Sequence, residues 1–573
     1  MGGVYGPLLA SHACTKLGSK AWEFVTPLLL LQFSDGTLIA PTVFGLAIFG
    51  FKFAFGPAAG RWMDHTERMR VIRYGIALQA VGVVSALGVL GLLVLQRNSS
   101  SSDALTAALG GGGMDAAAEM QAATATEAAA PESVITSGGA PPATTAGLPI
   151  GLLVAMVACG CAEALGALVS SVAVKKDWVP SIFAPTDPTL SRMNTAMANI
   201  DLIAEIVGPL GAGLALQFFG GDAAGGFVLV GLANVVTFGV ELVLLRNVFL
   251  SNAQLQAPKP VPTPTAASSG EGSGSCGGCC SCGFFSAWPA FTSHPSGIPL
   301  LVISYALLYF TVLSPHGVVL TAYLQTRALS PPALATFRAL GALAGVAGMG
   351  AFRMLSERLG LRRLATLHLW VLALAVAGAA SSFAATHGSS GLTTPMTCFL
   401  GLVVLSRFGL YGFDVAVLQL QQVHVDETLR GSVGAVESSL CSLGTATLLV
   451  GTLLTSASGN ANAFDVLVYA SSGFVGSAAL TYTAWVLLFH EHEHAHPLFE
   501  PGGSGGGGVP GAQHKHTHQQ MRALEDSTER THVHLHFHPP WSHALSHLKQ
   551  VAGGDATAHT HTHGGHTHTH GGH

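Results

Sequence analysis

Long runs of apolar residues recur along the whole chain, and each run ends at charged residues or at a cluster of Gly, Pro, Ser or Thr. A helix needs about 20 such residues to cross a hydrocarbon layer of about 30 Å. The runs are continuous and do not alternate, which argues against a membrane β-barrel. We therefore predict twelve transmembrane helices, near residues 8–33, 37–59, 71–96, 149–174, 193–219, 223–245, 298–326, 331–353, 364–385, 393–420, 431–456 and 463–489.

Polar segments of low complexity divide these spans. Residues 247–297 are rich in Pro, Ser and Gly, so we predict that they form a cytosolic linker between two six-helix bundles, 8–246 and 298–489. The two bundles would rock about a central site. Residues 97–148, rich in Ala, Gly, Ser and Thr, are expected to be a disordered, non-cytosolic loop. Residues 490–573 are expected to be a disordered tail. The predicted fold class is an all-α membrane protein.

The composition agrees with this prediction. The chain is 49% hydrophobic and only 10% charged, with a mean hydropathy of +0.49. A soluble domain carries roughly 25% charged residues, so an ordinary soluble enzyme is disfavoured. The small net charge of −5 gives no basic surface for nucleic acid.

The positive charges indicate the orientation of the chain. Lys and Arg concentrate in the loops after the even-numbered spans, whereas the opposite loops hold only Arg97 and Arg327. The positive-inside rule therefore places both termini in the cytosol. The first residues do not have the pattern of a cleavable signal sequence. We expect a monomer in the plasma membrane or in a vacuole-like membrane, with the lipid bilayer as its partner.

Several ionisable residues fall inside the expected first span, where burial in lipid is costly and each such group marks a candidate site. Because they are spaced by three or four residues, four polar side chains share one face of the helix: His12, Lys16, Ser19 and Glu23. We predict that this face lines a cavity. The alternative for Glu23 is an ion pair with Lys20 or Lys16.

Charged residues also suggest a gate. Asp64 and Arg68 lie in GPAAGRWMDHTERMR after the second span, and a similar pattern, AFRMLSERLGLRR, follows the eighth. Small residues followed by charges at matching loops look like the cytosolic gate of the major facilitator superfamily, so we expect ion pairs that open and close. Arg407 and Asp414 are seven residues apart in the tenth span and are expected to form a structural pair.

Two further segments have the composition of metal-binding sequences. The linker contains CGGCCSC, whose thiols can bind zinc or copper(I), with palmitoylation as the alternative: Cys276, Cys279, Cys280 and Cys282. Of the 27 histidines, 20 lie between 490 and 573. In His-x-His repeats the imidazoles share one side of an extended chain and bind borderline metal ions. The representative positions are His490, His492, His494, His534, His536, His561, His563, His568 and His570.

The chain resembles the ferroportin family of metal exporters over nearly all of residues 8–489. The segments that carry this resemblance are SHACTKLGSKAWEF, GPAAGRWMDHTERMRV, KKDWV, SRMNTAMANIDLIAEIVGPLGAG and RFGLYGFDVAVLQLQQVHVDETLRGSVGAVESS. The resemblance implies efflux of divalent iron from the cytosol, or its transfer into a vacuole-like store, by alternating access. It also implies a major facilitator-like fold with a metal site in each half.

The resemblance implies ligands as well. The first helix of the family offers an Asp and, four residues on, a His or Glu, and here these positions hold Ser19 and Glu23. Gln79, Asn234 and Glu241 match positions of a calcium site in vertebrate members, and the alternative is a buried polar network that fixes helix packing.

The seventh span is expected to be broken, because Pro315 and Gly317 flank His316. The family carries its second metal site at a broken seventh helix. The vertebrate Cys corresponds to Gly317 and its partner His to Leu448, so His316 is the remaining donor, unless it is a packing residue.

The resemblance also bears on gating and on the choice between functions. Asp201 matches a family Asp, for which we expect a gating salt bridge to Lys176 or Arg70. No resident cofactor is expected, and ferrous iron is the expected cargo, with Ca²⁺ as a further possible ligand. The alternatives are a nickel, cobalt or zinc exporter, a vacuolar sequestration transporter, and a metal sensor that does not transport. An enzyme is not expected.

Overall fold

The structure is a computed structural model in which two compact units can be distinguished. The first unit comprises Met1–Thr292 and Val302–Ala479, and the second Ser293–Leu301 and Leu480–His573. The described residues are 2–34, 39–110, 149–184, 188–259, 287–294, 296–315, 317–386, 391–457, 463–497, 531–538, 558–563 and 566–571.

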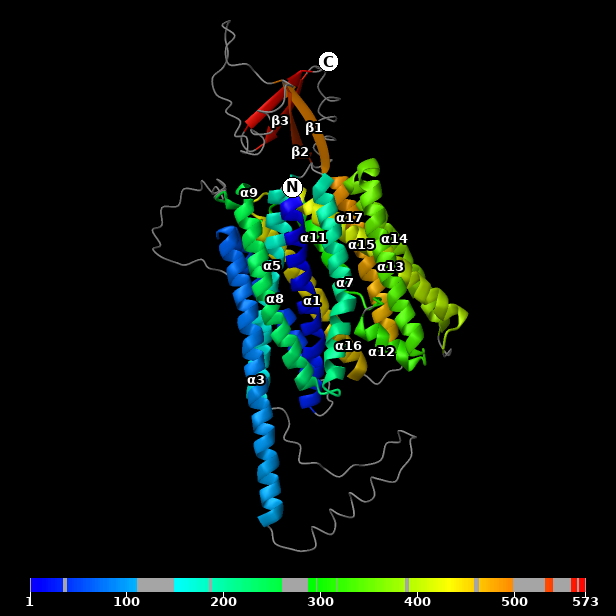
Figure 1. The fold of residues 1–573 in the computed structure, drawn as a ribbon. Coiled ribbons are helices and arrows are strands. Elements are labelled where there is room, and N and C mark those ends of the chain that lie inside the picture. The colour runs from blue at the N-terminus through cyan, green and yellow to red at the C-terminus, as the bar shows by residue number, and fades with distance from the viewer. Residues whose placement is uncertain are drawn as a thin grey trace, which may run out of the picture. The chain divides into compact units, whose positions relative to one another are not determined.

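Long helices lie side by side in the first unit (Figure 1). Those of the first half of the chain are α1 (Gly2–Phe33), α2 (Ile39–Asp64), α3 (Arg68–Gly110), α5 (Ile150–Val172), α6 (Val179–Ile182), α7 (Pro188–Phe218), α8 (Ala223–Ser251), and the short α9 (Ala253–Gln256) and α10 (Ala287–Thr292). Those of the second half, parts of which reach into the second unit, are α11 (Ile298–Leu307), α12 (Val318–Thr326), α13 (Pro331–Leu359), α14 (Leu361–Phe383), α15 (Thr394–His424), α16 (Arg430–Ala457) and α17 (Ala463–Leu488).

Ten helices in the described part of the chain are long and apolar enough to cross a membrane. They correspond to ten of the twelve predicted spans. The first predicted span, α1, is 32 residues long, but Lys16, Lys20 and Glu23 interrupt its apolar sequence. The seventh predicted span is divided into α11 and α12.

The break between α11 and α12 covers residues 308–317, as expected near Pro315 and Gly317. Polar side chains satisfy backbone groups that the break frees. Ser471 Oγ accepts a hydrogen bond from the Val312 N–H (3.0 Å), and Arg407 Nη2 donates to the Leu313 carbonyl (2.6 Å). Irregular backbone at membrane depth is stable only where such partners exist.

A π-helical segment, Ala173–Trp178, follows α5 directly and continues into α6. Its sequence is AVKKDW, so three consecutive charged residues lie on it. A π turn inserts an extra residue and thereby changes the direction of the side chains that follow, and such turns are frequent at functional sites.

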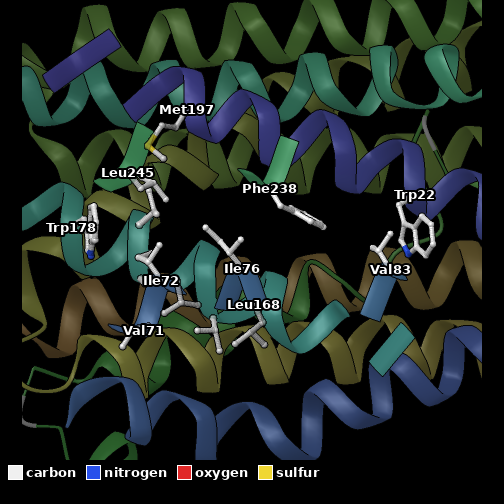
Figure 2. Packing of buried hydrophobic residues seen from close by; sticks show 14 of the residues in the cluster. Trp22, Val71, Ile72, Ile76, Val83, Leu168, Trp178, Met197, Phe238 and Leu245 are labelled. Carbon is white, nitrogen blue, oxygen red and sulfur yellow. The ribbon is translucent and has the colours of Figure 1, made fainter. Parts of the chain in front are cut away.

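One hydrophobic core cluster lies among the helices of the first half of the chain. Trp22 of α1, Ile72 of α3, Leu168 of α5, Met197 of α7 and Leu245 of α8 belong to one cluster of buried residues, and Figure 2 shows their neighbours Val71, Ile76, Val83, Trp178 and Phe238 in the same interior. The rings of Trp22 and Phe227 approach to 4.5 Å between centroids.

Two predictions of disorder differ from the structure. Helix α3 continues to Gly110, because the run SSSSDALTAALG contains no proline and no glycine before its end, so the first part of 97–148 is helical. The tail, expected to be disordered, contains strands β1 (His490–Pro497), β2 (Thr531–His538), β3 (Ala558–His563) and β4 (His566–Gly571), paired as β1–β2 and β3–β4. Residues 111–148 and the rest of the tail lie outside the described residues.

Candidate functional site

Polar side chains from both halves of the chain surround two adjoining cavities in the first unit. One has a volume of about 370 Å³ and the other of about 480 Å³. Both are lined by Lys16, Lys20, Lys175, Tyr305, Tyr309, Asp414 and Thr445. Because these residues belong to α1, the π segment, α11, α15 and α16, the cavities lie between the two halves.

Three residues of the predicted face of α1, Lys16, Ser19 and Glu23, line the cavities, whereas His12 is buried and lines neither of them. Ser19 and Glu23 border the smaller cavity. The Glu23 carboxylate pairs with Lys20 Nζ at 2.9 Å, and Lys20 also lies 3.6 Å from Glu205 of α7. The alternative ion pair for Glu23 is therefore the one present in this state, although its side chain stays 57% exposed.

Asp201 is the centre of a cluster of basic side chains. His12 Nε2 lies 2.9 Å and Lys16 Nζ 3.9 Å from its Oδ1, and Lys175 donates to Oδ2. The prediction of a salt bridge from Asp201 to Lys176 or Arg70 is wrong. The π segment turns Lys175 toward Asp201, while Arg70 pairs with Glu67 at 3.7 Å on the exposed surface.

Lys176, the next residue of the π segment, binds the second half of the chain. Its Nζ donates to Glu437 Oε1 (2.6 Å) on α16 and to Gln421 Oε1 (2.7 Å) on α15. Gln421 also donates to the other oxygen of Glu437. Adjacent lysines thus bind carboxylates on opposite halves.

Arg407 and Asp414 do not pair with each other. Asp414 accepts a hydrogen bond from the Tyr305 hydroxyl, and Arg407 bonds to the Leu313 carbonyl in the break between α11 and α12. Both line the larger cavity, so the predicted structural pair is replaced by two separate contacts to the seventh span. The carbonyls freed by the helix break attract Arg407 away from the carboxylate.

Asp64, in the first half of the chain, makes a contact with the second half that the sequence did not predict. Its carboxylate accepts hydrogen bonds from the backbone N–H groups of Gly431 (2.7 Å) and Ser432 (2.8 Å). These groups lie in the first turn of α16, where free N–H groups and the helix dipole favour a negative charge. Asp64 of α2 therefore caps a helix of the other half, which goes beyond the ion pair predicted for it.

Arg68 forms ion pairs in the structure, as its sequence context predicts. It is 3% exposed. Its Nε lies 3.3 Å from Asp177 Oδ1, and its Nη2 pairs with Glu427 between α15 and α16. Lys259 Nζ lies 2.9 Å from the other Asp177 oxygen. One buried arginine thus joins the π-segment carboxylate to the second half of the chain.

Small residues let α2 and α16 approach closely beside this network. A Cβ atom on Gly60 would lie 2.6 Å from both the Ala435 Cβ and the Gly431 carbonyl oxygen, and one on Gly56 would lie 2.3 Å from Ser439 Oγ. Small residues at such positions are typical of closely packed membrane helices.

Gln79, Asn234 and Glu241 are all buried. Gln79 Nε2 donates to Ser170 Oγ (3.1 Å), and Asn234 Nδ2 donates to the Gly18 carbonyl (3.2 Å), contacts that hold neighbouring helices together. In the described part of the chain, Gln79 Oε1 and Glu241 Oε2 have no hydrogen-bond partner. Buried oxygens of this kind fit a hard cation such as Ca²⁺ in their chemistry.

Other predicted residues are not tested by the geometry. His316 and the four linker cysteines lie outside the described residues, and the tail histidines occupy strand positions. Among the described residues, no three His, Cys, Asp or Glu side chains converge to hold a metal ion in this state. The sequence did not identify Lys175, Glu437 and Tyr305 as cavity residues, although the charge of Glu437 inside the predicted span 431–456 was a signal for that residue.

The protein-family comparison decides the relationship. A family model described as Ferroportin1 (FPN1) matches residues 4–475. The chain belongs to the ferroportin family. Ferreportin of Bdellovibrio bacteriovorus is 29% identical over 481 residues, which are 83% of this chain and 93% of that protein. Solute carrier family 40 member 1 of Oryza sativa subsp. japonica is 24% identical over 501 residues, which are 85% and 91% of the two chains.

Solved structures of a bacterial homologue of the iron transporter ferroportin share the fold of this ferroportin-family chain. Its outward-facing state has a TM-score of 0.64 at 28% identity and covers 84% of this chain and 99% of that one. The same state with soaked iron scores 0.63, and the inward-facing state scores 0.52. Family and fold indicate an integral membrane transporter and not an enzyme.

Proposed function

We propose that this ferroportin-family chain exports divalent metal ions, with ferrous iron as the leading substrate, by alternating access between two six-helix bundles. The observation that carries the proposal is the position of the charged cavities between the halves, with a closed network of Asp64, Arg68 and Lys176 at one end. Helix α1 and the broken α11–α12 segment complete twelve spans in this proposal. The bacterial homologue with soaked iron supports the choice of iron.

The conformation fits an outward-facing state. The gate residues lie in or beside the loops that are rich in Lys and Arg, which the positive-inside rule assigns to the cytosol. The higher similarity to the outward-facing state than to the inward-facing state, 0.64 against 0.52, supports this assignment. Both termini are then cytosolic, and cargo leaves the cavities on the opposite side.

The charge pairs of the cavities explain how cargo would be held only transiently. Glu23, Asp201 and Glu437 each contact a lysine in the state described here. A divalent ion that enters must displace these lysines to gain carboxylate ligands, and the lysines return when it leaves. Carboxylates suit hard and borderline divalent ions. Gln79, Asn234 and Glu241 would hold a Ca²⁺ ion apart from the cargo.

Flux measurements test the proposal. The purified protein is reconstituted into liposomes that contain a metal-sensitive dye, and we expect saturable uptake of Fe²⁺. The uptake of Co²⁺, Ni²⁺ and Zn²⁺ is measured in the same way, and each is also added as a competitor of Fe²⁺. Absence of saturable flux for all four ions would overturn the proposal. Stronger flux of Ni²⁺, Co²⁺ or Zn²⁺ than of Fe²⁺ would make that ion the proposed substrate in place of iron. Ser19 favours this alternative, because it stands where the family has an Asp.

A cavity variant with a matched control tests the carboxylates. Asp201→Asn removes the charge that three basic side chains surround, so we expect flux to fall at least about tenfold, the loss that one charge-assisted contact of about 1.5–3 kcal/mol implies. Glu357→Gln changes an exposed carboxylate on α13 that lines neither cavity and should leave flux unchanged. Equal flux in both variants would remove Asp201 from the transport path.

A further inference from the structure

The first residues of the linker after α8 are held against the first half of the chain. The Asn252 side chain accepts hydrogen bonds from the backbone N–H groups of Gln254 (2.9 Å) and Leu255 (3.4 Å) and so begins the short helix α9. The Leu255 side chain is 1% exposed and belongs to the hydrophobic core cluster of the first half. Pro258 favours the extended backbone that Ala257 adopts, so α9 ends there.

Beyond α9 the chain contacts the buried network of Arg68 and Asp177. Arg68 Nη1 donates a hydrogen bond to the Ala257 carbonyl (3.0 Å). Lys259 Nζ lies 2.9 Å from Asp177 Oδ2 and donates to the Met63 carbonyl (2.9 Å) near the end of α2. The Lys259 side chain is only 11% exposed, so these contacts hold a charged group largely away from water.

Four charged side chains are thus in direct contact, and their formal charges cancel. Arg68 pairs with Asp177 of the first half and with Glu427 of the second half. Lys259 pairs with the other Asp177 oxygen. If Glu427 leaves, two cations share one carboxylate, and if Lys259 leaves, two carboxylates share one arginine. An unbalanced buried charge is costly, so the contacts of Glu427 and Lys259 stabilise each other.

The end of this linker segment is not packed tightly against the loop between α2 and α3. A cavity of about 470 Å³ lies between them, lined by residues 64–68 on one side and 255–259 on the other. The two segments therefore meet through the polar contacts of Arg68 and Lys259 and not through a packed apolar surface. Segments with few packed apolar contacts are the ones that open locally.

We propose that residues 257–259 are a latch on the cytosolic gate, which holds Arg68 and Asp177 in place while Glu427 is bound and is released when the second half withdraws. The inference rests on the proposed function, because it takes these ion pairs as the gate. The chain continues from Lys259 through the linker to the second half, so the segment that joins the halves also responds to whether they are closed.

The first experiment removes the charge of the latch. Lys259→Met keeps a side chain of similar length and should favour the open gate at least about fivefold, the lower end of typical couplings between two sites. The measurement is the rate at which a membrane-impermeant maleimide alkylates Cys441, which lines the smaller cavity, in inside-out vesicles. Gln254→Ala changes an exposed side chain of α9 and is the matched control, which should leave the rate unchanged.

The reciprocal experiment leaves Lys259 intact and measures whether the latch is released. A membrane-impermeant amine-reactive ester modifies Lys259 in the same vesicles, and mass spectrometry of its peptide gives the rate. Because coupling between two sites is reciprocal, Asp64→Asn, which weakens the contact between α2 and α16, should raise the rates of Lys259 and Cys441 together. Asp222→Asn, which alters a helix cap within the first half, should raise neither.

These outcomes separate the latch from the proposed function. An unchanged Cys441 rate in Lys259→Met, or an equal rise in Gln254→Ala, would overturn the latch. An unchanged Lys259 rate in an Asp64→Asn protein whose Cys441 is exposed would overturn it as well. If both rates change as expected in a protein without saturable metal flux, the latch stands and the proposed export is refuted. Saturable flux with unchanged rates would refute the latch alone.

Discussion

Asp64 is the residue whose structural role differs most from that of an ordinary gate carboxylate. It caps α16 across the boundary between the halves, and its two hydrogen bonds exist only while α2 and α16 are together. Asp222 makes comparable bonds, to Ala224 N (3.2 Å) and Gly225 N (3.0 Å) of α8, but within one half of the chain. The same chemistry thus joins the two halves of the chain in one place and caps a helix within one half in the other.

The variant Asp64→Asn should shift the protein away from the closed gate. It removes the charge and at least one bond to the α16 N-terminus, a loss of about 1–3 kcal/mol, and so should favour the open gate by a factor between about 5 and about 160. The measurement is the rate at which a membrane-impermeant maleimide alkylates the cavity residue Cys441 in inside-out vesicles, followed by mass spectrometry of its peptide. The rate should rise in Asp64→Asn.

Asp222→Asn is the matched control for this experiment. Because Asp222 caps a helix without spanning the two halves, this variant should lose a similar contact and leave the alkylation of Cys441 at the unaltered rate. If both variants accelerate alkylation equally, general loosening of the helices explains the effect, and a gating role for Asp64 is refuted.

At the scale of elements, hydropathy predicted the positions of the long helices well, but it did not predict which charged side chains pair between them. Apolar runs are a local signal, so ten long helices lie where the sequence placed them. The partner of Asp201 depends on the π segment, because one extra residue in a helical turn decides that Lys175 points to Asp201 and Lys176 to Glu437. No periodicity in AVKKDW distinguishes a π turn from an α turn.

The candidate site was predictable to a similar extent. The polar face of α1 could be predicted because its polar residues are three or four positions apart, as on one face of a helix. Both Ser19 and Glu23 do line a cavity. The sequence could not predict that Arg407 and Asp414 stay apart, because Arg407 bonds to a carbonyl group that is free only in the break between α11 and α12. Disorder in the tail was predicted from its glycine content, although the alternation of histidine already had the period of a strand.

The pair of helices α2 and α16 gives a prediction at this scale. Gly60→Ala places a Cβ atom within 2.6 Å of Ala435 and Gly431, so the helices must move apart and the gate cannot close fully. We expect flux to fall several-fold and Cys441 to become more accessible from the cytosolic side. Gly50→Ala on the same helix is the control, because its Cβ meets nothing within 4 Å.

The comparison of Gly60→Ala with Gly50→Ala also depends on helix propensity. Replacing a helical Gly by Ala ordinarily stabilises a helix by about 0.5–1 kcal/mol, so Gly50→Ala should retain flux and unfold at the same or a higher temperature. If Gly60→Ala behaves like Gly50→Ala in flux and in alkylation, close contact of α2 and α16 is not needed for transport.

At the scale of the whole molecule, transport should not require the tail, residues 490–573. A chain that ends at Phe489 retains every residue that lines the two cavities and the gate network. It should therefore keep saturable flux with an unchanged maximal rate. Loss of all flux in a truncated protein that still elutes as a single species would instead show that transport requires the tail.

Helix α3 begins at Arg68, for which we propose a role in the gate, and runs without interruption to Gly110. Its 43 residues correspond to about 64 Å at 1.5 Å per residue, roughly twice the thickness of the hydrocarbon layer. A stiff rod of this length magnifies small rotations, since a tilt of about 10° displaces the far end by about 11 Å. A spin label near Gly110 would therefore report gate movements of a few degrees as distance changes that pulsed electron-spin resonance resolves easily.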